Sequence, residues 1–263
     1  MSVQARLSAT VVIPCLNEEE SIGGLVEDIA AVRDDPATPI EITMILVVDN
    51  GSTDDTALVA RQAGACIITE PRRGYGRACL SGVLASGPVD YIVLMDGDRS
   101  DVPDDLPKLL EPLLSGDADL VVGSRTLGSY EKGSLHPQQI AGNKVAALLA
   151  RWFYGVRLTD IGPFRVIRKR NLLELGMREM TYGWSIEMII RAKRKGLTVT
   201  EVPVRYRRRA GGSSKVSGNL KGTVKAGYRI IAAIFRARKD DRPLPDGLAA
   251  WQERHAASDE AAS

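Results

Sequence analysis

The chain has 263 residues, of which 44% are hydrophobic and 26% are charged. This composition is typical of a globular protein with a sizeable buried core, and it excludes collagen-like, disulfide-scaffold and wholly disordered classes. Lys and Arg number 35 against 33 Asp and Glu, a formal net charge of +2. No global charge therefore favours nucleic acid, and none is expected as a partner.

The predicted elements alternate between strand and helix through the first half of the chain. Strands are predicted at 9–14, 42–48, 65–69, 91–95 and 120–123, and helices at 19–32, 52–62, 76–86 and 106–114. An almost unbroken apolar run such as 42–48 is typical of a parallel strand covered on both faces. The alternation predicts an α/β protein with an open, mostly parallel sheet flanked by helices.

The alternation loosens in the second half. Residues 126–138 are rich in Gly and Ser, so we expect a loop of the kind that forms lids. Further helices are predicted at 140–154, 185–195 and 221–236, and strands at 164–167 and 199–204. The sequence thus predicts an N-terminal extension over 1–8, one domain over 9–238 and a disordered tail over 239–263.

Cysteine and histidine are too sparse for a zinc site. Cys15, Cys66 and Cys79 form no CxxC pair, and the only histidines are His136 and His255. The N-terminal residues hold no apolar segment of signal-peptide length, and no stretch approaches the ~18 apolar residues of a membrane-spanning helix. We therefore expect a cytoplasmic protein.

Polar residues follow four of the predicted strands. These segments are Pro14-Cys15-Leu16-Asn17-Glu18, Asp49-Asn50-Gly51-Ser52, Asp96-Gly97-Asp98 and Ser124-Arg125. Ligands of open parallel sheets bind at the carboxyl ends of the strands, so these segments are expected to converge on one site. One such segment alone is explained equally well as turn residues and caps.

The segment with the clearest chemistry is Asp96-Gly97-Asp98. Two carboxylates at the end of a buried strand can hold Mg²⁺ or Mn²⁺ against a diphosphate, because these cations prefer oxygen ligands and complete their shell with water and phosphate. Two phosphate-binding motifs are not supported. Residues 74–79 only approximate GxGxxG and follow the wrong strand, and no GxxxxGK[ST] occurs.

A basic segment runs from residue 205 to 239. It holds eleven Lys or Arg and no Asp or Glu, the basic residues being Arg205, Arg207, Arg208, Arg209, Lys215, Lys221, Lys225, Arg229, Arg236, Arg238 and Lys239. The loop 209–215 suits phosphate binding. The following helix is basic and amphipathic, which favours either an anionic membrane surface or packing on the sheet with a solvated basic face.

Taken in order, these motifs resemble glycosyltransferase family 2, whose members have the GT-A fold. The resemblance is carried by Val12-Ile13-Pro14 with Asn17-Glu18-Glu19, by Val48-Asp49-Asn50-Gly51-Ser52-Thr53-Asp54 and by Met95-Asp96-Gly97-Asp98. A finer similarity, to the dolichyl- and polyprenyl-phosphate sugar synthase branch, is carried by 123–125, 160–165, 182–187 and 209–215. The chain departs from the family at Asn50, where a second Asp is common, and at Arg99, which follows the acidic pair.

The resemblance implies an inverting, metal-dependent hexosyltransferase that uses a nucleotide-sugar donor of the GDP-mannose or UDP-glucose type. The implied nucleotide-sugar-binding residues are Pro14, Asn17, Glu18, Asp49, Asp96, Gly97, Asp98 and Arg125. The implied phosphate- or acceptor-binding residues are Arg125, Arg165, Arg209, Ser214 and Lys215. Asp96 and Asp98 would bind the Mg²⁺ or Mn²⁺ ion, and Asp98 is also a catalytic candidate.

The nature of the acceptor decides whether a base is needed. A phosphate monoester is mostly dianionic at neutral pH and needs only positioning, whereas an alcohol needs a carboxylate base. Glu187 and Asp160 are the candidates for that base, with a helix-terminus charge and a turn cap as their structural alternatives. The basic segment favours a polyprenyl or dolichyl phosphate, and hence a peripheral position on the cytoplasmic face of the membrane.

Three other functions are compatible with parts of the sequence. A transferase acting on a soluble or glycan alcohol would share the donor site. A sugar-1-phosphate nucleotidylyltransferase would need a basic, Gly-rich loop where Asn17-Glu18-Glu19-Glu20 stands. A non-catalytic membrane-surface module would use only the basic segment, and the intact Asp96 and Asp98 pair argues against it.

Overall fold

The computed structural model describes residues 6–211, 220–237 and 242–260. Its strands are β1 (Ser8–Cys15), β2 (Glu41–Asp49), β3 (Cys66–Thr69), β4 (Tyr91–Leu94), β5 (Leu120–Tyr130), β6 (Arg165–Arg168) and β7 (Val199–Tyr206). Its α-helices are α1 (Glu19–Asp34), α2 (Thr56–Gln62), α3 (Tyr75–Ala85), α4 (Leu106–Leu114), α5 (Pro137–Tyr154), α6 (Lys169–Glu174), α7 (Trp184–Arg194), α8 (Leu220–Arg236) and α9 (Asp246–Glu260). None of these helices combines the length and apolar character needed to cross a bilayer.

The strands form one mixed sheet of seven in the order β3-β2-β1-β4-β6-β5-β7. Only β6 runs antiparallel to its neighbours β4 and β5, so the expected mostly parallel sheet is confirmed. Because β1 pairs in parallel with both β2 and β4, the carboxyl ends of all three strands lie at the same edge. The segments that follow them are thereby brought together.

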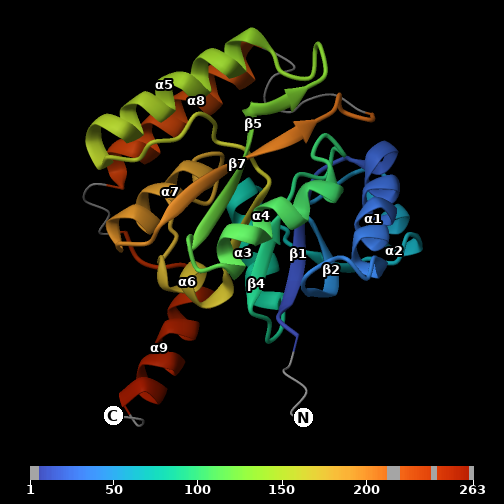
Figure 1. Cartoon of the computed structure of the whole chain (residues 1–263), viewed down its shortest axis with the longest axis horizontal. Helices are drawn as coiled ribbons and strands as arrows, with labels where there is room; N and C mark the ends of the chain where they lie inside the picture. Colours follow the sequence, from blue (N-terminus) through green and yellow to red (C-terminus); the bar gives the residue numbers. More distant parts are fainter. Residues whose placement is uncertain (1–5, 212–219, 238–241, 261–263) are drawn as a thin grey trace.

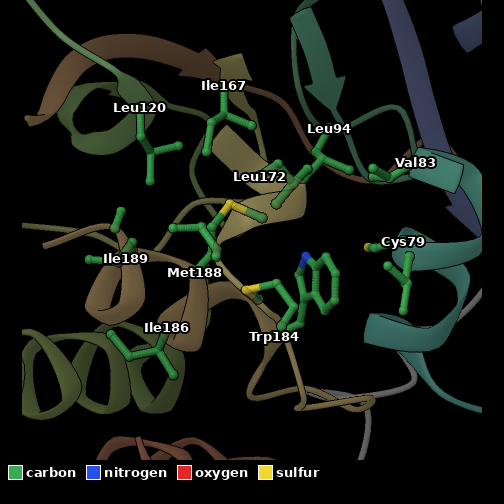
Figure 2. Close-up of a cluster of buried hydrophobic side chains, with 14 of the residues drawn as sticks. Cys79, Val83, Leu94, Leu120, Ile167, Leu172, Trp184, Ile186, Met188 and Ile189 are labelled. Atoms are coloured by element: carbon green, nitrogen blue, oxygen red, sulfur yellow. The ribbon is translucent and has the colours of Figure 1, made fainter. Parts of the chain in front are cut away.

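Helices cover both faces of the sheet (Figure 1), and each face has its own apolar core. Alternate residues of β1 divide between the two, since Val12 belongs to one core and Val11 and Ile13 to the other. Helices α1, α2 and α4 pack on the second face. Helices α3 and α5 to α9 contribute to the first, where Trp184 is surrounded by apolar side chains from α3, α6, α7 and the central strands (Figure 2).

The predicted loop over 126–138 is only partly correct. Strand β5 continues to Tyr130 and pairs with β7 on both sides of an irregular stretch, and α5 already begins at Pro137. A Cβ atom at Gly128 would lie 2.0 Å from the carbonyl oxygen of Val204. The glycine that suggested a loop therefore allows two strands to approach closely, which no local signal reveals.

The predicted disordered tail is also wrong in part. Residues 246–260 form α9, and Leu248 is buried in the core of the first face. Gln252 adds a hydrogen bond from its side chain to the backbone carbonyl of Leu173 on α6. Two smaller differences are that α2 begins at Thr56 rather than near 52, and that the short helix α6 was not expected.

Candidate active site

Four carboxylates from three parallel strands line the carboxyl edge of the sheet. Asp49 ends β2, and its Oδ1 accepts the Ser52 backbone N–H at 2.8 Å. Glu18 precedes α1, and Asp96 and Asp98 follow β4. The hydroxyl of Ser21 on α1 donates to the Gly97 carbonyl at 2.9 Å, which fixes the loop between the two aspartates to the first helix.

Asp96 is the least compensated of these carboxylates. Its Oδ1 is inaccessible to solvent and has no hydrogen-bond partner. Burial, and then the neighbouring Asp98 carboxylate, raise the pKa of Asp96 well above its usual value, although a hydrogen bond with Tyr75 works in the opposite direction. Two carboxylates that repel each other in a poorly solvated place favour a cation between or beside them.

The residues present fit a divalent cation that is shared with a substrate. Within residues 6–211, 220–237 and 242–260, no group of three or more His, Cys, Asp or Glu side chains is placed to hold a metal ion. Asp96 and Asp98 would supply two protein oxygens. Mg²⁺ and Mn²⁺ accept such sites, because water and phosphate oxygens complete their coordination.

Arg209 links the two acidic segments. Its Nη2 donates to Glu18 Oε1 at 3.0 Å and to Asp98 Oδ2 at 3.2 Å. The backbone of the same stretch is anchored as well, since Ala210 N–H donates to the carbonyl of Asp98. The predicted phosphate residue Arg209 therefore does lie at the site. Ser214 and Lys215, predicted beside it, lie outside the described residues.

The remaining residues of the first segments shape the backbone of the site. Pro14 is the penultimate residue of β1, half-buried and level with Val48. Asn17 has a φ of 52°, in the left-handed region that Asn tolerates better than most residues, and its Oδ1 accepts the Thr53 backbone N–H at 2.8 Å. This contact joins the loop after β1 to the loop after β2.

Asn50, where the family often has a second Asp, has a structural explanation. Its buried Nδ2 donates to the backbone carbonyls of Glu70 at 2.8 Å and Arg72 at 2.9 Å, and its Oδ1 accepts the Gly74 N–H at 2.8 Å. A carboxylate could not donate either of the first two hydrogen bonds. The amide is therefore required to hold the β3–α3 loop beside the site.

Arg99, the other departure from the family, points away from the two aspartates. Its φ is 60°, and its guanidinium makes two hydrogen bonds to the Asp28 carboxylate on α1, at 2.8 and 2.9 Å. A Cβ atom at Gly24 would lie 2.2 Å from Arg99 Nη1, so Gly24 makes room for this pair. The acidic character of the Asp96 and Asp98 pair is thus not offset by Arg99.

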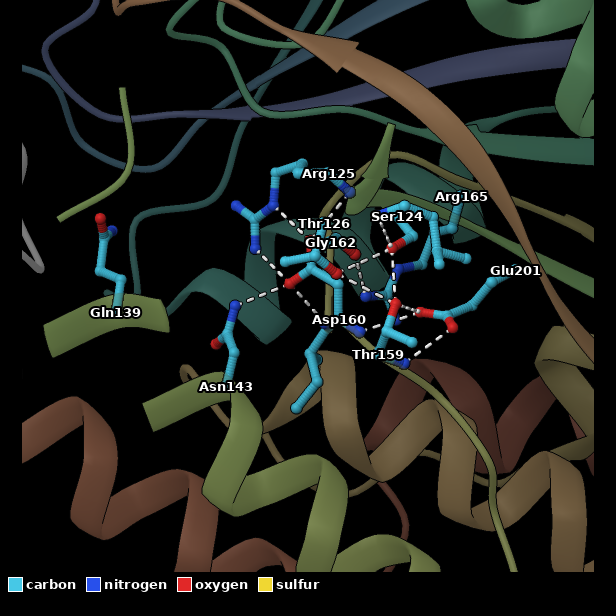
Figure 3. Close-up of polar contacts among 12 residues, drawn as sticks. Ser124, Arg125, Thr126, Gln139, Asn143, Thr159, Asp160, Gly162, Arg165 and Glu201 are labelled. Carbon is cyan, nitrogen blue, oxygen red and sulfur yellow. Dashed lines mark hydrogen bonds and ion pairs between the residues drawn. The ribbon is translucent and has the colours of Figure 1, made fainter. Parts of the chain in front are cut away.

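Arg125 on β5 is buried and held in place by Asp160 (Figure 3). Its Nε and Nη2 donate to the two Asp160 oxygens at 2.6 and 2.8 Å. Asp160 Oδ1 also accepts Asn143 Nδ2 at 2.7 Å. Burial raises the pKa of Asp160, but the Arg125 contact outweighs it and the pKa is lowered overall. The Asp160 backbone N–H donates to Glu201 Oε1 at 2.9 Å, and this contact secures the loop.

The two residues predicted as possible bases have their carboxylates turned to protein groups. Asp160 is fully buried against Arg125 and Asn143. Glu187 is 2% exposed, accepts the backbone N–H groups of Arg178 and Glu179, and pairs with Arg191 at 2.8 Å. Both positions favour structural roles, and the assignment of either residue as a base stays a prediction.

Arg165, predicted to bind phosphate, is 1% exposed. Its guanidinium donates to the backbone carbonyls of Ser185, at 2.9 Å, and Gly162. Burial lowers the pKa of Arg165. A phosphate group could reach this side chain only if these contacts opened, so its placement favours a role inside the fold.

Two residues at the site were not expected from the sequence. Tyr206 at the end of β7 lies under the Arg125 guanidinium, whose carbon is 5.0 Å from the ring centre. Asp101 forms a bridge with Tyr206 through the backbone, is 1% exposed, and has no hydrogen-bond partner on either carboxylate oxygen. Burial raises the pKa of Asp101 well above its usual value. Asp101 lies six residues beyond the predicted strand 91–95, too far to be found by that criterion, whereas Tyr206 lies two residues beyond the predicted strand 199–204 and was within its reach.

Comparison with known proteins agrees with this geometry. The sequence profile of Glycosyl transferase family 2 matches residues 10–176. An uncharacterized glycosyltransferase of Mycobacterium tuberculosis (strain ATCC 25618 / H37Rv) is 41% identical over 221 residues, which cover 83% of this chain and 94% of that protein. A dolichyl-phosphate hexose transferase of Haloferax volcanii is 36% identical over 204 residues, covering 76% of this chain and 83% of that protein.

A solved structure shares the fold. Glucosyl-3-phosphoglycerate synthase from Mycobacterium tuberculosis, in complex with Mn²⁺, uridine diphosphate and glucosyl-3-phosphoglycerate, has a TM-score of 0.69 and 25% sequence identity. The match covers 88% of this chain and 80% of that one. The likeness therefore extends well beyond the segment matched by the family profile.

Proposed function

The chain belongs to glycosyltransferase family 2 and is a glycosyltransferase with the GT-A fold, and we propose that it moves a sugar from a nucleoside diphosphate sugar to a polyprenyl phosphate. One observation carries the proposal. The buried cation Arg125 lies over Tyr206, and Tyr206 forms a backbone bridge with Asp101, three residues after Asp98, which supports one site for Arg125 and the carboxylate pair. Carboxylates suit a metal-bound diphosphate, and an arginine suits a second phosphate.

The donor half of the site is assigned to the loops after β1, β2 and β4. Pro14, Asn17, Glu18 and Asp49 would contact the nucleoside, and Gly97 allows the chain to pass close to Cys15, whose Sγ would lie 2.5 Å from a Cβ there. Asp96 and Asp98 would hold Mg²⁺ or Mn²⁺. When bound, the ion neutralises the charge that develops on the departing diphosphate.

The acceptor half is assigned to Arg125 and Arg209. A phosphate monoester is mostly dianionic at pH 7, so it attacks the anomeric carbon from the face opposite the diphosphate and needs no base. This agrees with the contacts of Asp160 and Glu187, whose carboxylates are both engaged by arginines. Arg125 would orient the attacking phosphate oxygen, and Arg209 would exchange its carboxylate partners for phosphate.

The relatives support an acceptor that carries a phosphate. One is named a dolichyl-phosphate hexose transferase, and another was solved with a glucosylated phosphoglycerate. The two names differ in whether that acceptor is a lipid. A lipid acceptor would place the protein peripherally on the cytoplasmic face of a membrane, and the basic composition of residues 205–239 favours this choice.

A donor and acceptor screen tests the proposal. The full chain is incubated with Mg²⁺ or Mn²⁺, with GDP-mannose, UDP-glucose or related donors, and with polyprenyl phosphate or 3-phosphoglycerate. Release of nucleoside diphosphate and the glycosylated product are both measured. We expect a metal-dependent polyprenyl phosphate sugar from one donor, with loss of product in Asp98→Asn and no loss in Asp34→Asn, a control at an exposed carboxylate on α1.

The alternative functions predict different products in this screen. A product on 3-phosphoglycerate alone would keep the transferase and reject the lipid acceptor. Transfer to neutral alcohols but never to a phosphate would reject the assignment of Arg125 and Arg209. A melting temperature that does not respond to any nucleotide sugar with metal, together with no product, would favour a non-catalytic surface module.

A further inference from the structure

Helices α5 and α8 expose large apolar side chains in two stripes. Three residues of each helix, spaced three and four apart, form a stripe: Val145, Leu148 and Trp152 on α5, and Tyr228, Ile231 and Phe235 on α8. This spacing places each set on one face of its helix. Trp152 is 80% exposed and Tyr228 is 71% exposed, values more typical of polar surface residues.

The two stripes belong to one surface. Helices α5 and α8 pack against each other side by side (Figure 1). The ring of Phe153 meets the ring of Phe235 edge to face at 5.3 Å and lies 6.1 Å from that of Trp152. The Tyr154 hydroxyl donates to the Ile234 carbonyl. We call this combined area the α5–α8 face.

The α5–α8 face reverses the usual distribution of side chains on a surface helix. The inner side of α5 buries the small residues Ala146, Ala147 and Ala150, and that of α8 buries Ala233 next to Ile234. The larger aromatic side chains point outward instead. A soluble helix normally buries its largest apolar residues, so the exposed area is suited to an apolar environment outside the protein.

The charged residues on α5 and α8 are all basic. Neither helix contains an Asp or Glu residue. Lys144, Arg151 and Arg236 are exposed on them, and Arg236 pairs with Glu179 at 3.1 Å. Aromatic and aliphatic residues flanked by Lys and Arg are typical of helices that lie in the interface of an anionic bilayer. A second copy of the chain would bring like charges together.

The inner side of α5 leads directly to the site. Asn143, two residues before the first member of the stripe, donates to Asp160, and Asp160 holds Arg125 (Figure 3). One helix therefore carries both the exposed apolar stripe and a contact to the partner of the phosphate-binding arginine. The exposed stripe and the Asn143 contact lie on opposite sides of this one helix, so α5 stands between the face and the site.

We infer that the α5–α8 face is the surface by which this protein lies on an anionic lipid bilayer, with Trp152, Tyr228 and their stripes at the level of the headgroups. The inference rests on the proposed function, because it assumes that the acceptor phosphate is held in a membrane. It goes further by naming the surface and by giving α5 an equal share with the basic helix α8.

Vesicle sedimentation tests the face without relying on catalysis. The full chain is mixed with vesicles of phosphatidylcholine alone or of phosphatidylcholine with phosphatidylglycerol. The test variant is Trp152→Ser with Tyr228→Ser, both exposed positions at which folding should be unaffected. The matched control is Leu58→Ser with Leu114→Ser, exposed leucines on α2 and α4 on the other side of the sheet.

We expect the wild type and the control to bind phosphatidylglycerol vesicles, and the test variant to bind them at least about tenfold more weakly. Binding of the test variant equal to that of the wild type would overturn the inference. So would binding to neither vesicle by the wild type. A dimer in light scattering that only the test variant abolishes would also overturn it, and would assign the face to a second copy of the chain.

Transfer assays separate this inference from the proposed function. With a short-chain, water-soluble polyprenyl phosphate and no vesicles, the test variant should keep wild-type turnover. With a long-chain acceptor embedded in vesicles, its turnover should fall about tenfold or more. If the wild type used neither acceptor yet the vesicle binding followed the face, the proposed function would fail while the membrane surface stood.

Discussion

The two sides of the site differ in how far their buried charges are compensated. On the side of β1, β2 and β4, Asp96 lies beside Asp98, one of its buried oxygens has no partner, and its pKa is raised. On the side of β5, Arg125 is buried, but Asp160 compensates it with two hydrogen bonds and is itself secured by Asn143. On the first side Arg209 pairs with Glu18 and Asp98 but Asp96 Oδ1 has no partner, whereas on the second side Asp160 neutralises Arg125.

This difference distinguishes residues that are available to bind a ligand from residues that hold the fold in place. A carboxylate that the fold leaves uncompensated is available for an ion or substrate, whereas a buried pair whose charges cancel mainly holds its members in position. Arg125 can do both, because Asp160 engages only one edge of its guanidinium. Another buried ion pair, Glu187 with Arg191, offers a comparison away from the carboxyl ends of the parallel strands.

The largest effect is expected from breaking the compensated side. Asp160→Asn leaves Arg125 buried without its counter-charge and should lower the free energy of unfolding by about 3–5 kcal/mol, measured by urea denaturation. Glu187→Gln should cost a similar amount, because Arg191 is equally buried. Only Asp160→Asn should also raise KM for the acceptor. Equal effects of both variants on KM would contradict the difference drawn between the two pairs.

Removing charge from the uncompensated side should affect activity and spare stability. Asp98→Asn is expected to reduce kcat/KM by about 100-fold or more, equivalent to about 2.7 kcal/mol of transition-state stabilisation. Its melting temperature should stay close to that of the wild type, since the substitution relieves repulsion with Asp96 while it weakens the partly exposed contact with Arg209. A loss of stability comparable to that of Asp160→Asn would show that Asp98 is a structural residue.

Asn50 tests whether a further carboxylate can be added to the acidic side. Asn50→Asp replaces a buried amide that donates to two backbone carbonyls. The free energy of unfolding should fall by about 2 kcal/mol or more, because the carbonyls lose their donors and face a negative charge. Asn50→Asp with unchanged stability and tighter metal-dependent nucleotide binding would instead assign this position to the metal.

The smallest effect is expected at Glu70, a carboxylate that follows β3 and whose charge is compensated by Arg72. Hydrogen bonds from Arg72, the largest influence, and from Ser81 lower the pKa of Glu70 from 4.5 to about 2. The resulting stabilisation is complete above pH 4.5 and is lost as the pH falls from 4.5 towards 2.

Arg72 is 65% exposed, so solvent screening limits the contribution to about 1–2 kcal/mol. Urea denaturation of the wild type and of Glu70→Gln at several pH values measures it. The difference between the two proteins should shrink across that window. A constant difference from pH 6 to pH 2.5 would mean that Glu70 is not held ionised by its neighbours.

Much of the side formed by the loops after β1, β2 and β4 could be predicted, because its residues directly follow strands that can be recognised in the sequence. Strands β1, β2 and β4 are continuous apolar runs, and the polar residues that matter follow each of them directly. Parallel pairing then brings Glu18, Asp49 and Asp96 to one edge whatever the details of packing. The departures at Asn50 and Arg99 were visible in the sequence, but their partners Glu70 and Asp28 were not.

The other side could not be predicted in the same way because its contacts span long separations. Asp160 is 35 residues from Arg125, and Glu201 is 41 residues from Asp160. As separate residues they fit a base, a turn cap or a surface charge equally well. Similarly, Gly128 suggested a loop until its close approach to Val204 was known, and residues 239–263 were predicted to be a disordered tail until the burial of Leu248 was known.

The sequence by itself determined the family, the α/β sheet and the acidic pair at the end of β4, because these depend on hydrophobic periodicity and on motifs of a few neighbouring residues. Only the tertiary structure decided which charges are compensated, since that depends on partners brought together by packing. It also decided that the aromatic residues of α5 and α8 share one exposed face, because helical spacing defines a stripe but not the direction in which the packed helix presents it.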